Sequence, residues 1–153
     1  MAQAQAAFSN QFSIIYLPVP LDGKCNHTVT EVYPPHTNAC QYARIGLAVW
    51  GAKKDQFAEF DRWVFQSPYP PSLEETAQFA ARLVGQHALE RELHDRWIDE
   101  QIQRNVQIYE ISFHKLGQHS LPQLIVGTNL TTGTFSRMES LLQLLDSQFA
   151  LRR

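Results

Sequence analysis

Two cysteines, Cys25 and Cys40, are the residues of this chain whose type and spacing most directly allow chemistry. A bond between them would close a loop of 16 residues, counted from 25 through 40. In an oxidising compartment this loop would stabilise the fold by about 3 kcal/mol, because it restricts the unfolded chain. A disulfide here predicts a separation of roughly 4.4–6.8 Å between the two α-carbons.

Three other interpretations of these cysteines stay open at the level of sequence. Cys25, His27, His36 and Cys40 could hold a zinc ion, although C-x-H and H-x3-C are not the usual ligand spacings. Cys40 could instead be a reactive thiol, since it lies in the first turn of an expected helix, where the dipole favours a thiolate. Both residues could also be free, half-buried thiols.

The remaining chemically active residues form no catalytic pattern, and no Ser/His/Asp or paired-carboxylate set can be assembled from the sequence. Four histidines follow no metal-ligand spacing: His87, His94, His114 and His119. Three tryptophans at apolar helical positions are expected to pack in the core: Trp50, Trp63 and Trp97. The mixed charges at residues 90–92 and 99–104 indicate the solvated face of a helix.

Length and composition predict one domain with a proper core, since the chain has 153 residues and is 44% hydrophobic. The net charge of -2, from 13 basic and 15 acidic residues, gives no reason to expect a nucleic acid or an anionic membrane surface as a partner. No apolar run approaches the roughly 20 residues that span a bilayer, so no membrane segment is expected in this chain. Met1 to Asn10 also lacks the features of a signal peptide.

A proline-led strand is the clearest local pattern. Pro122 has no backbone N–H and fits at the start or edge of a strand, and the β-prone residues Gln123 to Val126 follow it. The stretch Thr128 to Gly133 combines turn residues with room for a short return strand. The amphipathic segment Phe135 to Phe149 then predicts a terminal helix.

The rest of the chain predicts one more strand and a series of helices. Met1 to Asn10 is rich in alanine and glutamine, which suits a helix, and Phe12 to Val19 is a strand candidate. Helical spacing, a Ser72–Glu75 capping box and a stop at Gly85 indicate helices in the centre. These are Ala39 to Trp50, Gln56 to Phe65, Leu73 to Val84 and about Ala88 to Val106.

This order of elements resembles the DsbA-like branch of the thioredoxin superfamily, where an all-helical insert precedes a proline-led hairpin and a closing helix. Two segments are similar to that family as well. The stretch from Pro20-Leu21-Asp22 through Cys25-Asn26 and His36 to Ala39-Cys40 is similar to its loop and first insert helix. Phe57 to Phe65 is similar to its aromatic segment. The resemblance covers nearly the whole chain and lies in the order and spacing of the motifs.

The resemblance implies an α/β fold, thioredoxin-like of the DsbA type, in a single domain over residues 1–153. The sheet part would lie at about 1–22 and 107–153, and the inserted all-helical lobe at about 38–106. The compartment would be periplasmic or otherwise extracytoplasmic.

The resemblance also implies a functional site at a proline loop. The Leu121–Pro122 bond would be cis, and Ser120, Leu121 and Pro122 would border a substrate groove and offer backbone groups to an extended peptide. The partner would be a protein thiol or disulfide substrate, or a redox partner.

One departure from the family concerns its redox centre. That centre is a CxxC at the start of the first helix, where a thiolate attacks and a second cysteine resolves the mixed disulfide. This sequence contains no CxxC. If Met1 to Asn10 is the tail of that helix, the domain is N-terminally incomplete, and its first strands and redox pair lie upstream. An incomplete sheet would expose a strand edge, which predicts self-association.

Two function classes follow. The chain is a thiol-disulfide oxidoreductase-type domain whose redox centre is absent from these residues, or it is a redox-silent module that binds a protein partner. In both cases we expect no catalytic residue, no metal site and no cofactor in this chain.

Overall fold

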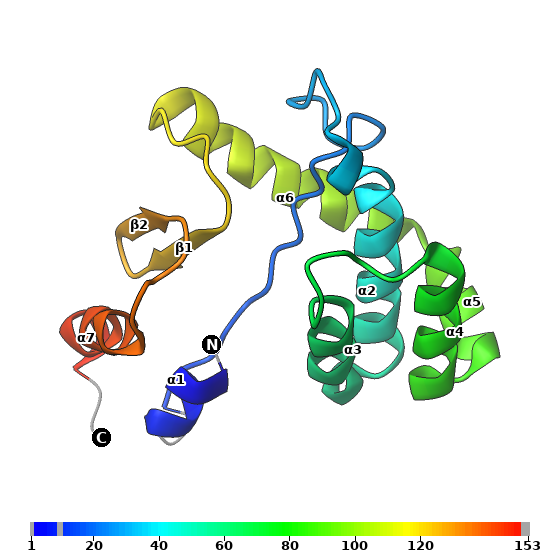
Figure 1. Ribbon diagram of the computed structural model, residues 1–153, viewed down its shortest axis with the longest axis horizontal. Helices are drawn as coiled ribbons and strands as arrows, with labels where there is room; N and C mark the ends of the chain where they lie inside the picture. Colours follow the sequence, from blue (N-terminus) through cyan, green and yellow to red (C-terminus); the bar gives the residue numbers. More distant parts are fainter. Residues whose placement is uncertain (1, 9–10, 151–153) are drawn as a thin grey trace. The chain divides into compact units, whose positions relative to one another are not determined.

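The structure is a computed structural model that describes residues 2–8 and 11–150 (Figure 1). The described residues mix helices with a two-stranded antiparallel sheet, which is compatible with an α/β fold. The helices are α1 (Ala2–Ala7), η1 (Pro34–His36), α2 (Ala39–Ala52), η2 (Lys54–Gln56), α3 (Phe57–Val64), α4 (Leu73–Val84), α5 (Gln86–Leu93), α6 (Arg96–Lys115) and α7 (Met138–Phe149). The strands are β1 (Gln123–Val126) and β2 (Asn129–Thr132).

The chain divides into two compact units, and each is described by itself. The helical unit comprises Leu17–Ile111, and the terminal unit comprises Met1–Tyr16 together with Ser112–Arg153. The helix α6 therefore belongs to the helical unit as far as Ile111 and to the terminal unit from Ser112 onward.

The helix α2 is the centre of the helical unit and contacts α3, α4 and α5. Its apolar residues pack with side chains from the other helices in one core: Ile45, Leu47, Ala48, Val49, Phe60, Val64, Ala80, Leu89, Ile98, Ile102 and Val106. The Ser72–Glu75 capping box at the start of α4 is confirmed, and Gly85 ends that helix with a φ of 89°, a value that favours glycine. Hydrogen bonds from Ser72 lower the pKa of Glu75.

The single helix predicted at about Ala88 to Val106 is wrong, because the chain forms two helices there. The helix α5 ends at Leu93 and α6 begins at Arg96. The break has a local cause, since the Asp95 carboxylate accepts a hydrogen bond from the backbone N–H of Trp97 at 3.1 Å and caps α6. The helix α6 also continues to Lys115, beyond the predicted end at Val106.

The terminal unit contains α1, the hairpin β1–β2 and α7, and in Figure 1 the hairpin leads into α7. The strands pair in antiparallel register, with Gln123 opposite Thr132 and Val126 opposite Asn129. The core of this unit joins both ends of the chain, because it is formed by Ala4, Phe8, Val126, Leu141 and Leu145. The terminal helix begins at Met138, three residues after the predicted start at Phe135.

The strand predicted at Phe12 to Val19 is wrong. Within the described residues up to Leu21 there is no strand, so the predicted sheet part at about 1–22 contributes none, and the described sheet lies in 123–132. A strand is defined by its ladder to a neighbour, and the described segment has none. Ile15 is 81% exposed there, which shows that its apolar side chain is not on a covered sheet face.

The expectation that all three tryptophans pack in the core is wrong for Trp50. The Trp63 ring stacks on Phe79 with 4.2 Å between ring centroids, and Trp97 also packs against the core. Trp50 is 42% exposed and lies 6.0 Å from the Trp97 ring, with the Lys54 ammonium 5.3 Å from its own ring centroid.

Among the helices in the described residues, none combines the length and the apolar character needed to cross a bilayer.

Candidate functional site

The proline loop precedes β1 in the terminal unit, and its Leu121–Pro122 peptide bond is cis. Ser120 and Pro122 are exposed, and Leu121 is half-buried. The Pro122 carbonyl accepts a hydrogen bond of 2.8 Å from the N–H of Gly133, which follows β2. This bond extends the hairpin by one pair and fixes the position of the proline relative to the sheet.

Two residues of the loop, Ser120 and Leu121, have backbone groups outside regular secondary structure. Within the described part of the chain, the N–H and C=O groups of Ser120 and Leu121 make no backbone hydrogen bond outside regular secondary structure. Neither residue lies in a helix or strand. An extended peptide can bind such groups by adding a short strand-like segment, in the manner of β-augmentation.

A pair of polar side chains holds the loop from the end of α6. The buried Ser112 hydroxyl donates a hydrogen bond of 2.9 Å to the side-chain oxygen of Gln123, the first residue of β1. The amide nitrogen of Gln123 donates in turn to the Gln118 carbonyl at 3.2 Å. The His119 ring lies edge-on to Phe113, with 4.0 Å between ring centroids. The loop therefore has a defined support, although its outer side is exposed.

The Cys25–Cys40 disulfide is present in the helical unit. The two α-carbons lie 6.0 Å apart, within the range that the sequence predicted. Cys40 is the second residue of α2, and Cys25 lies in the loop before it. Both cysteines are consumed by this bond, so the zinc interpretation and the reactive-thiol interpretation of Cys40 are wrong for this structure.

The loop that carries Cys25 is fixed by buried polar residues. The Asp22 carbonyl accepts hydrogen bonds from the N–H groups of Cys25 and Asn26. The Asn26 amide is fully buried, donates to the Pro20 carbonyl at 2.8 Å and accepts from Thr28. These bonds satisfy the Asn26 side chain and fix the loop next to the disulfide.

The other residues considered for metal binding do not come together. In the described residues, no group of three or more His, Cys, Asp or Glu side chains is placed to hold a metal ion. His27 approaches Glu110 at 3.4 Å, and His36 lies against the Tyr33 ring.

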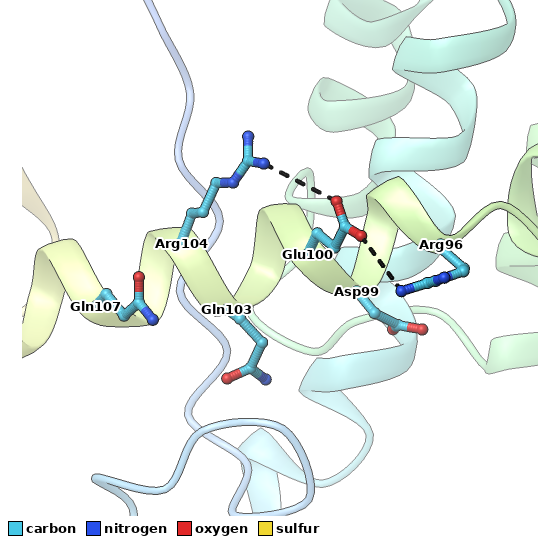
Figure 2. A pocket seen from close by; sticks show the side chains of 6 residues that line it. All are labelled: Arg96, Asp99, Glu100, Gln103, Arg104 and Gln107. Carbon is cyan, nitrogen blue, oxygen red and sulfur yellow. Dashed lines mark ion pairs between the residues drawn. The ribbon is translucent and has the colours of Figure 1, made fainter.

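A charged hollow lies along the exposed face of α6, and Figure 2 shows its side chains. Glu100 lies between Arg96 and Arg104, with a nitrogen–oxygen distance of 3.9 Å to each. All of its lining residues come from this one helix: Arg96, Asp99, Glu100, Gln103, Arg104 and Gln107. Exposed pairs at this spacing contribute little free energy, so the hollow is the solvated helix face expected for residues 99–104.

Comparison of the chain with protein-family models, with curated proteins and with solved structures finds no match in any of the three.

Sequence reasoning missed the residues that support the proline loop. Ser112 lies beyond Val106, where the sequence predicts the end of this helix, whereas α6 continues to Lys115. The helical spacing of Val106, Tyr109 and Ser112, all buried, is the signal that could have extended the helix.

Proposed function

We propose that this chain supplies the peptide-binding part of a thioredoxin-like domain of the DsbA type. In this proposal the domain is of the thiol-disulfide oxidoreductase type, and its redox pair is not among these 153 residues. Ser120, Leu121 and Pro122 bind an extended segment of a protein thiol or disulfide substrate.

The observation that carries the proposal is the core shared by the two ends of the chain. Ala4 and Phe8 from the N-terminal end pack with Val126, Leu141 and Leu145, although the whole helical unit lies between them in sequence. A helical insertion between a first segment and a proline-led hairpin with a closing helix is the arrangement of the DsbA-like branch. The sequence resemblance and this packing therefore support the same fold.

The chemistry of the loop agrees with peptide binding. Ser120 and Leu121 offer backbone groups outside regular structure, and the Ser112–Gln123 hydrogen bond holds the adjoining strand. A ligand that uses backbone groups tolerates many side chains, which suits a domain that acts on different proteins.

Replacement of Ser120 tests the proposal. Ser120→Pro removes the backbone N–H of the loop, whereas the matched control Ser120→Ala removes only the hydroxyl and keeps the N–H. We expect a fluorescein-labelled extended peptide with one S-methylated cysteine to bind the original chain and the Ala variant equally. The Pro variant should bind about tenfold more weakly, the loss expected for one hydrogen bond of about 1.4 kcal/mol.

A second candidate, a redox-silent module for a protein partner, is favoured by the two cysteines themselves. Their disulfide joins α2 to the loop that precedes it, and the sequence has no CxxC. An insulin-reduction assay separates the two candidates when the chain is extended by its upstream coding sequence. Turnover that depends on an upstream cysteine pair supports the oxidoreductase-type domain, and its absence supports the redox-silent module.

A further inference from the structure

An apolar pocket of about 430 Å³ lies wholly within the helical unit. Its walls come from the segment 18–21, from η1, α2 and α3, and from the connection 65–70. The volume falls in the range of small-molecule sites, about 300–1,000 Å³. The disulfide and the proline loop contribute no residue to it, so the pocket is separate from the proposed peptide site.

Aromatic rings form much of the pocket. Phe57 and Phe60 from α3 lie beside Gly46 of α2, where an added β-carbon would stand 3.6 Å and 3.4 Å from the two rings. Tyr42 lies about one turn before Gly46 on α2 and also lines the pocket, and its hydroxyl donates to the Pro71 carbonyl at 2.6 Å. Phe65 lines the pocket and is nevertheless 76% exposed, so much of its side chain faces the solvent.

One carboxylate, Asp61, lines this apolar space, and no lysine or arginine does. Its side chain has no ion pair or hydrogen bond to any other described residue. Burial raises the pKa of Asp61, because apolar surroundings disfavour the charged form. The other titratable groups of the lining are His36, which contacts Tyr33, and Tyr42, whose hydroxyl is already bonded.

An unpaired carboxylate among aromatic rings is complementary to one kind of ligand. A cationic nitrogen can form a charge-assisted hydrogen bond with the carboxylate, and the ring faces attract the same charge. The apolar walls require that the rest of the ligand be hydrophobic. We propose that this pocket binds a small primary amine carried on an aromatic body, with Asp61 as the counter-ion.

The test compares two ligands of similar shape and different charge on the full 153-residue chain. 2-Phenylethylamine carries the ammonium group, and 2-phenylethanol is its neutral counterpart. Binding is followed by NMR titration of the backbone amides of α2 and α3. We expect the amine to shift the amides of Tyr42, Gly46 and Asp61 in a saturable way, and to bind about tenfold more tightly than the alcohol.

Two matched variants assign the preference to one carboxylate. Asp61→Asn should reduce the amine's affinity to that of the alcohol and leave the alcohol's affinity unchanged. Asp55→Asn removes the same charge from an exposed residue outside the pocket and should keep the tenfold preference. Equal affinities of the two ligands for the original chain, an amine preference that survives Asp61→Asn, or no saturable shift at these amides would each overturn the proposal.

Discussion

The Ser112 hydroxyl donates a hydrogen bond to the side-chain oxygen of Gln123 at 2.9 Å, which ties the end of α6 to the first residue of β1. The donor is buried, and the Gln123 amide continues the chain of bonds to the Gln118 carbonyl. The side chain of Gln123 therefore bonds both to Ser112 and to the Gln118 carbonyl. It closes the segment from Gln118 to Gln123, which contains the cis peptide bond.

Ser112→Ala should destabilise the fold by about 1 kcal/mol, because it leaves the Gln123 oxygen without its donor. Part of this loss is offset by the higher helix propensity of alanine. Urea denaturation measures the change in the free energy of unfolding. Ser136→Ala, at an exposed position in the same unit, serves as the control and should change that free energy by less than about 0.5 kcal/mol. Equal stability of the two variants would show that the bond contributes nothing.

The Cys25–Cys40 disulfide should stabilise the helical unit by about 3 kcal/mol, since it closes a long loop in the unfolded chain. The double variant Cys25→Ala with Cys40→Ala is expected to lose this amount in urea denaturation. A reductant should lower the stability of the original chain and leave the double variant unaffected. If the reductant has the same effect on both, the loss does not come from the disulfide.

Local patterns predicted the hairpin, the starts of α2 and α4, and the disulfide, because each depends on residues close in sequence. Pro122 and Gly127 mark the ends of β1, and the Ser72–Glu75 pair marks the start of α4. The structure of the segment Phe12 to Val19 could not be predicted from local patterns. Its β-prone residues favour a strand, but a strand forms only beside a partner, and none lies beside the described part of this segment.

The apolar pocket was also outside the reach of sequence. Asp61 is one of several acidic residues on helices, and its sequence neighbours do not show which way the carboxylate faces. Its position depends on how α3 packs against α2 and on the connection that follows, which are tertiary contacts. Periodicity indicates which face of α3 is buried, but not whether the neighbouring space is filled.

Asp61→Asn should make the stability of the protein less dependent on pH. Burial raises the pKa of Asp61, so the folded state holds this proton more tightly than the unfolded chain does. Its stabilising contribution is present below the ordinary aspartate pKa and is lost as the pH rises through the raised value. The Asn variant should therefore be more stable than the original chain at neutral pH, by less than about 1 kcal/mol, because the carboxylate is only half-buried.

Thermal unfolding of both proteins across the acidic range checks this prediction, with Asp55→Asn as the exposed control. If the stability advantage of the Asn variant over the original chain grew as the pH fell, the effect would have the opposite sign. That result would contradict the burial of Asp61.

The hairpin should promote self-association. In the described residues β1 pairs with β2 and with no other strand, so each strand has an unpaired edge, and Ile125 is 59% exposed beside it. Sedimentation should show a concentration-dependent dimer. Ile125→Lys should weaken it by at least about tenfold, since burial of an isoleucine is worth about 1.5–3 kcal/mol. Thr128→Lys adds the same charge at the exposed turn and should have little effect. A monomer at all concentrations would exclude this edge as an interface.

Amide hydrogen exchange at Ser120 and Leu121 tests most directly whether the proline loop binds an extended peptide. The exchange rates are measured by NMR with and without a saturating concentration of the S-methylated cysteine peptide. The peptide should slow exchange at Ser120, whose N–H the Ser120→Pro variant removes, and at Leu121, while the exposed Thr128 amide is unchanged. Bound peptide with unchanged exchange at both loop amides would contradict the assignment of the peptide site to Ser120, Leu121 and Pro122.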